Sequence, residues 1–76
     1  MSAPIREFDV SGVAAPFYVL RAKQVLDQMA VGQILALTTD APHAPREIRS
    51  LVEHLGHQLV SGEATGGSHR FMIRRL

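Results

Sequence analysis

Two segments of the chain carry apolar residues at helical spacing on one side only, and this feature restricts the fold most. Polar side chains fill the other side of both segments, which span about residues 16–30 and 45–55. The apolar positions are Val19, Ala22, Leu26 and Met29 in the first segment and Ile48, Leu51, Val52 and Leu55 in the second. A helix with one apolar stripe buries one face, so each helix is expected to cover one face of a sheet.

Segments with the character of β-strands flank these helices. They span residues 6–10, 33–39, 57–64 and 68–75, and turn-forming glycines or prolines bound them. In the last segment Phe71 and Ile73 alternate with Arg70, Met72 and Arg74, which predicts one buried and one exposed face.

The order of elements is therefore β-α-β-α-β-β. Thr65-Gly66-Gly67 is typical of a hairpin turn between the last two strands. Right-handed crossovers would place both helices on the same side of the sheet. The sequence thus predicts an α/β fold, a two-layer sandwich with both helices on one face of a four-stranded mixed sheet. With 76 residues, the chain is expected to form a single domain over 1–76 with an ordered core of about 6–75.

The composition excludes several functions. The chain has no cysteine, which rules out disulfides, thiolate metal sites and cysteine nucleophiles in this sequence. No apolar run approaches the roughly 20 residues of a membrane span, and "MSAPIREFDV" lacks the layout of a signal peptide. We expect a cytoplasmic protein without membrane contact. No phosphate-binding glycine loop or catalytic triad spacing is present, so no cofactor is expected.

The start of the first helix is unusually apolar. Pro16 suits the first helical turn, because its missing N–H has no partner there. The expected partner-binding residues are Ala14, Ala15, Pro16, Phe17 and Tyr18, since aromatic side chains make good anchors in interfaces. The alternative is that Phe17 and Tyr18 fold back onto the core.

Four histidines do not suggest a metal site. His54 and His57 are near in sequence, but Gly56 breaks the helix between them, and His43 and His69 lie elsewhere. A metal needs three or four converging ligands. No metal is therefore expected.

Arginines gather near the C-terminus. Arg70, Arg74 and Arg75 could form a basic strip for an anionic partner, either RNA or an acidic protein surface. The alternative is a solvated strand face whose charges protect a sheet edge. The net charge of +1 gives weak support to nucleic acid as a partner.

An ordered set of motifs resembles the TusA/SirA/YedF family of small sulfur-carrier proteins, over roughly Arg6 to Arg74. The motifs are Asp9-x-x-Gly12, x-x-Ala15-Pro16, Leu20-x-Ala22, Met29-x-x-Gly32-x-x-Leu35, Thr39-Asp40, Glu47-Ile48 and Gly56-His57-x-Leu59. The resemblance implies the same β-α-β-α-β-β fold. In that family the cysteine of a Cys-Pro-x-Pro signature accepts sulfur as a persulfide and passes it on.

The signature is altered here. Ala15 stands at the cysteine position, Pro16 keeps the first proline and Tyr18 replaces the second. A methyl group cannot form a persulfide, and Ser11, the nearest upstream hydroxyl, cannot carry sulfur. The resemblance therefore implies a non-catalytic, partner-binding or regulatory member whose partner is a sulfur-relay protein.

Two alternatives stay open. The first is a genuine sulfur carrier, for tRNA thiolation or sulfur trafficking, whose active cysteine was mutated to Ala15; Tyr18 argues instead for natural divergence. The second is a small RNA-binding module. If the scaffold still presents the family's site, Ala15→Cys would give a thiol more acidic than the ordinary value of ~8.5, because a helix N-terminus stabilises a thiolate.

Overall fold

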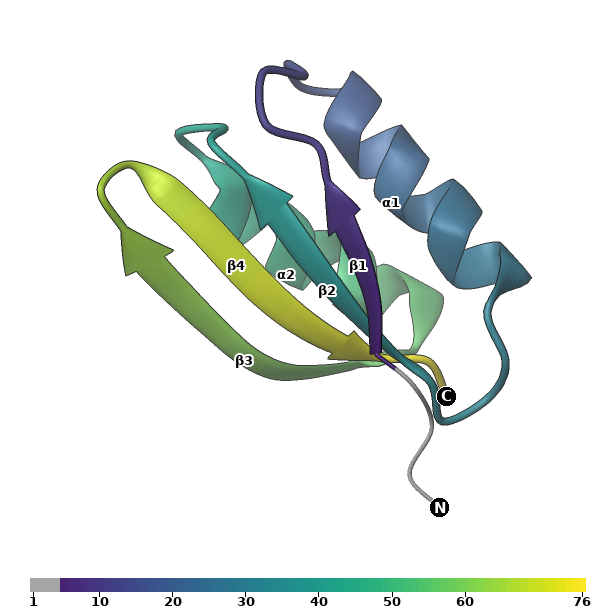
Figure 1. Cartoon of the computed structure of the whole chain (residues 1–76). Coiled ribbons are helices and arrows are strands. Elements are labelled where there is room, and N and C mark those ends of the chain that lie inside the picture. The colour runs from purple at the N-terminus through teal and green to yellow at the C-terminus, as the bar shows by residue number, and fades with distance from the viewer. Residues whose placement is uncertain (1–4) are drawn as a thin grey trace.

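The computed structural model describes residues 5–76 and has the predicted order of elements (Figure 1). The elements are β1 (Ile5–Asp9), α1 (Phe17–Gln28), β2 (Ile34–Thr39), α2 (Ala44–Leu55), β3 (Gln58–Thr65) and β4 (Ser68–Arg74). The predicted ends differ from these by one or two residues, where helices fray and strands lose pairing. The predicted strand and helix types are confirmed throughout.

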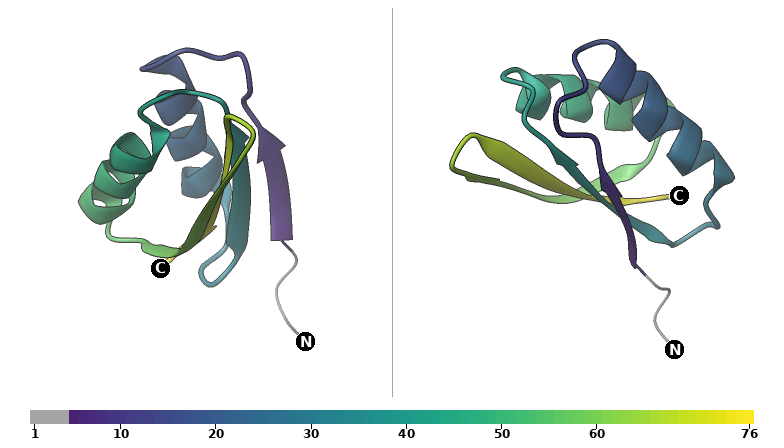
Figure 2. Two further views of the ribbon diagram at one scale, coloured as in Figure 1. Left: turned by 90° about the vertical axis from the view of Figure 1, so that its left-hand side faces the viewer. Right: turned by 45° about the horizontal axis from the view of Figure 1, so that its top comes forward.

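The sheet has the strand order β1-β2-β4-β3. β1 runs parallel to β2, whereas β4 lies between β2 and β3 and is antiparallel to both. Both helices lie on one side of this sheet (Figures 1 and 2), so the predicted two-layer mixed α/β sandwich is confirmed. β1 and β3 are consequently the two edge strands.

The core lies between the sheet and the helices. Leu35 and Leu37 of β2 and Ile73 of β4 are fully buried there. From the predicted helical stripes, the buried residues are Ala22, Leu26, Met29, Ile48 and Val52. Phe71 is also buried, while its neighbour Arg70 is exposed, as the alternation in the last strand predicts.

Glycines allow the chain to reverse its direction at the end of α2 and in the turn between β3 and β4. Gly56 ends α2 in the left-handed conformation, with φ of 75°, and its N–H donates to Val52 O and Glu53 O. Gly66 and Gly67 both have positive φ, 57° and 81°, which suits the two-residue hairpin turn between β3 and β4. Among the described residues, neither helix is long and apolar enough to cross a membrane.

Candidate functional site

The loop from β1 to α1 is held by two hydrogen bonds near its β1 end. Ser11 N–H donates to Asp9 Oδ1 at 2.9 Å, and hydrogen bonds from Ser11 lower the pKa of the Asp9 carboxyl below its usual value. Gly12, with φ of 82°, donates its N–H to Asp40 Oδ1 at 2.9 Å. Since Asp40 follows β2, this bond fastens the loop before α1 to the loop before α2.

Ala15 is exposed at the N-terminus of α1. No side chain caps this helix, and its first turn has no acidic residue. The N–H groups of Phe17 and Tyr18 both donate to Ala14 O, at 2.9 and 3.3 Å. These two amides would otherwise be free to stabilise an anion at position 15.

Tyr18 does not lie on the surface, in agreement with the alternative in which its side chain folds back onto the core. Its side chain is 0% exposed, and its hydroxyl donates to Glu47 Oε1 at 2.6 Å. Burial, followed by the hydrogen bond to Glu47, raises the pKa of Tyr18 far above its ordinary value. The side chain packs inward because its ring fills the core and its hydroxyl finds a carboxylate at the core's edge. Sequence patterning gave no sign of this pair.

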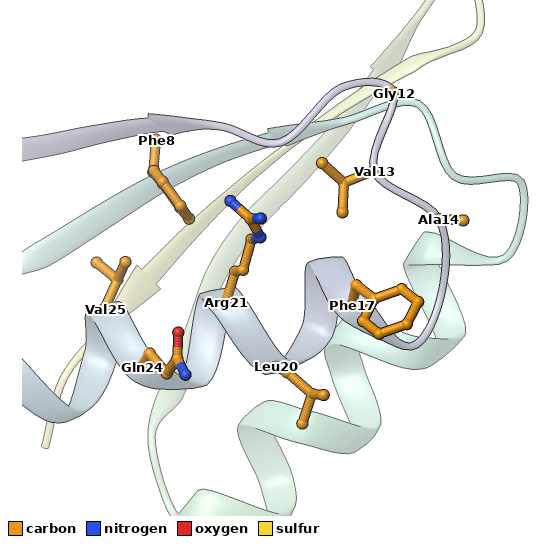
Figure 3. A pocket seen from close by; sticks show the side chains of 9 residues that line it. All are labelled: Phe8, Gly12, Val13, Ala14, Phe17, Leu20, Arg21, Gln24 and Val25. Atoms are coloured by element: carbon orange, nitrogen blue, oxygen red, sulfur yellow. The ribbon is translucent and has the colours of Figure 1, made fainter.

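Phe17 behaves in the opposite way, with 62% of its side chain exposed. It borders an open groove of about 690 Å³ between the first helix and the first strand, which we call the α1–β1 groove (Figure 3). The groove is lined by Phe8, Gly12, Val13, Ala14, Phe17, Leu20, Arg21, Gln24 and Val25. Ala14 and Phe17 of the expected partner-binding residues therefore share one surface.

Among the described residues, Arg21 is the only charged one that lines the α1–β1 groove. Figure 3 shows its guanidinium rising from α1 toward β1, between Phe8 and Val13. The helical spacing of the sequence places Arg21 on the polar side of α1 and predicts no function for it. Its spacing of four residues from Phe17 was the signal that the two share a helix face.

A second hollow of about 420 Å³ lies on the other side of the loop, against the start of α2. Ala15 borders it, together with Ala14 of the same loop. The carboxylates of Asp40 and Glu47 line it as well, with His43 beside them. The surroundings of Ala15 are thus acidic on this side, which disfavours a further negative charge at that position.

The three C-terminal arginines each have a separate hydrogen-bond partner. Arg70 binds Glu7 through two hydrogen bonds of 2.6 and 3.0 Å. Arg74 donates to Gln58 Oε1 at 3.1 Å, on the open face of the sheet. Arg75 instead donates to Leu26 O at 2.9 Å, near the end of α1.

The histidines have separate surroundings. His57 Nδ1 accepts a hydrogen bond from Leu76 N–H at 3.2 Å, and the His69 ring stacks on Phe71 with centroids 6.0 Å apart. Within residues 5–76, no three His, Asp or Glu side chains come together as metal ligands.

Fold and site together define a small two-layer α/β domain in which the N-terminus of α1 carries the methyl group of Ala15. The family model "Sulfurtransferase TusA" matches residues 6–75. The curated "Sulfur carrier protein TusA" of Allochromatium vinosum is 30% identical over 70 residues, which cover 92% of each chain. The chain therefore belongs to the TusA family of sulfurtransferases, and it lacks the cysteine of that family's signature.

Proposed function

We propose that this chain is a non-catalytic TusA-family protein that binds a sulfur-relay protein through the N-terminal end of α1. The observation that carries the proposal is the exposed Phe17 ring, two residues from Ala15, the position of the signature cysteine. Phe17 borders the same groove as Ala14 and the exposed Leu20, so its ring is part of an apolar patch, and exposed apolar patches mark interaction sites. A partner that approaches position 15 of a carrier would meet this ring.

The partner-binding residues of this proposal are Ala14, Ala15, Pro16 and Phe17, all exposed in the folded chain. Tyr18 contributes indirectly, because it fastens the start of α1 to α2 through Glu47. A fixed backbone lowers the entropy lost when the surface binds. The curated relative is named a sulfur carrier, so a protein that supplies or receives sulfur is the partner class that we propose.

RNA binding receives no comparable support. Arg70 bonds across β2 to Glu7 of β1, Arg74 bonds to Gln58 of the neighbouring β3, and Arg75 bonds to the end of α1. Such separated side chains do not offer phosphates the continuous strip that strong backbone binding uses.

Site-specific photo-crosslinking tests the proposal. Phe17 is replaced by a photoreactive phenylalanine in cells of the source organism, and Val31, which is 77% exposed in the α1–β2 connection, is replaced as a matched control. A desulfurase, sulfurtransferase or persulfide carrier crosslinked from position 17 but not from position 31 supports the proposal. Capture of no sulfur-relay protein, or equal capture from both positions, contradicts it.

A further inference from the structure

The α1–β1 groove opens beside a free sheet edge. Within residues 5–76, β1 pairs with β2 alone, and α1 packs on β2 and α2 next to it (Figure 1). Val10 N–H, just after β1, donates to Thr38 O at 2.8 Å. Because the backbone groups of a strand alternate in direction, Ile5, Glu7 and Asp9 direct their N–H and C=O groups away from β2. An unpaired edge of this kind accepts another extended chain.

The side chains that line the α1–β1 groove are apolar apart from Arg21 and Gln24. Phe8 forms the strand side of the groove, whereas Phe17 and Leu20, which is 52% exposed, stand on the helix side. No carboxylate from the described part of the chain lines the groove. Across residues 5–76 the structure contains no hydrogen bond or ion pair from the Arg21 side chain, so its charge is available to a ligand.

We propose that the α1–β1 groove receives an extended acidic segment of a partner protein, which pairs with β1. Alternate side chains of such a segment would point into the groove. Apolar ones would contact Phe8 and Phe17, and a carboxylate would bind the Arg21 guanidinium in the two-pronged geometry that arginine favours. The proposal names the chemistry of the partner, and it rests on the proposed function for the existence of that partner.

A second copy of this chain is a poor occupant of the groove. In the register of the sheet, Arg6 and Phe8 of β1 pair with Leu35 and Leu37, whose side chains face the helices. If β1 of another molecule paired with this edge, its Arg6 would enter the side that already holds Arg21. Like charges brought together in this way are destabilising.

A helical partner would also use the groove less fully. It could cover Phe17 and Leu20, but it would leave the outward N–H and C=O groups of β1 to water. An extended segment uses both the apolar groove and the strand edge, and this is why the geometry favours it.

Peptides selected from a random library displayed on phage test the proposal. The full chain is the bait, and the selected peptides are titrated into isotope-labelled protein by NMR. We expect the selected peptides to carry an acidic residue two positions from an apolar one. We also expect the largest changes in amide chemical shift at Ile5–Asp9. Arg21→Glu should weaken these peptides at least tenfold, and exchange of the peptide's acid for lysine should restore binding to that variant. Arg49→Glu, an equal charge change at an exposed site on α2, is the matched control and should bind as the unaltered chain does.

Several results would overturn the proposal: selection of no peptides, peptides without a carboxylate, a helical bound peptide, binding by a second copy, or equal losses from both charge reversals. The proposed function has a separate outcome. If the partner crosslinked from position 17 binds Arg21→Glu unchanged, the groove proposal fails and the proposed function stands. If acidic peptides bind at β1 but no sulfur-relay protein is captured, the proposed function fails and the groove proposal stands.

Discussion

Tyr18 and Glu47 are joined by a hydrogen bond of 2.6 Å that links the first turns of the two helices. Tyr18 occupies the place of the second signature proline and is fully buried. This chain therefore has no nucleophile at the signature position, and it has a contact between its two helices three residues further on. This pair fixes the start of α1, where Phe17 is exposed.

Loss of the Tyr18 hydroxyl should lower stability without disturbing the core. We expect Tyr18→Phe to reduce the free energy of unfolding by about 1–2 kcal/mol, because a hydrogen bond to a carboxylate is lost. Urea denaturation measures the change. A double-mutant cycle with Glu47→Ala should give a coupling of similar size, and additive effects of the two substitutions would contradict the contact.

Burial of the Tyr18 hydroxyl, together with its bond to Glu47, should make stability depend on alkaline pH. The folded pKa of Tyr18 lies above the unfolded value of about 10, so its contribution is full below pH ~10 and is lost as pH rises toward the folded pKa. Tyr18 is the only tyrosine, so tyrosinate absorbance reports it alone. We expect no tyrosinate near pH 10 until the chain unfolds. Ordinary titration in the folded state would contradict the buried hydroxyl, and Tyr18→Phe is the control for the other groups.

Restoring the thiol should not restore its activation. In Ala15→Cys, the Phe17 and Tyr18 amides remain bonded to Ala14 O, and Asp40 and Glu47 line the adjacent pocket. We therefore expect a thiol pKa at or above about 8.5 and poor sulfur uptake from a persulfide donor. Alkylation rate against pH measures the pKa. A clearly lower value with ready persulfide formation would favour a sulfur carrier from which only the cysteine was removed.

The fold follows from the sequence because each helix has a single apolar stripe and each strand ends at a turn signal. The site was only partly predictable. The apolar residues at 14–18 indicated a surface patch in this region. Successive residues of a helix point in different directions, so Phe17 faces water while Tyr18 faces the core, and the sequence pattern did not predict which of the two would be buried. The pairing of Tyr18 with Glu47, 29 residues away, and of Arg70 with Glu7, 63 residues away, depends on tertiary packing that local patterns do not encode.

The dispersed arginines predict that the chain does not bind RNA measurably. Titration of labelled single-stranded RNA at low salt should show no saturable binding, since Arg70 is held by Glu7 and Arg75 lies near the end of α1. The RNA-binding alternative would be supported by an affinity for RNA that decreases steeply as salt is added and that is lower still for Arg74→Ala.

The affinity of the crosslinked sulfur-relay partner for two matched variants tests the central claim most directly. Calorimetric titration compares the unaltered chain with Phe17→Ser and Val31→Ser, each of which removes an exposed apolar side chain and leaves the core intact. We predict that Phe17→Ser weakens binding at least tenfold, about 1.4 kcal/mol, and that Val31→Ser leaves it unchanged. Equal affinity of all three proteins would contradict docking at the N-terminus of α1.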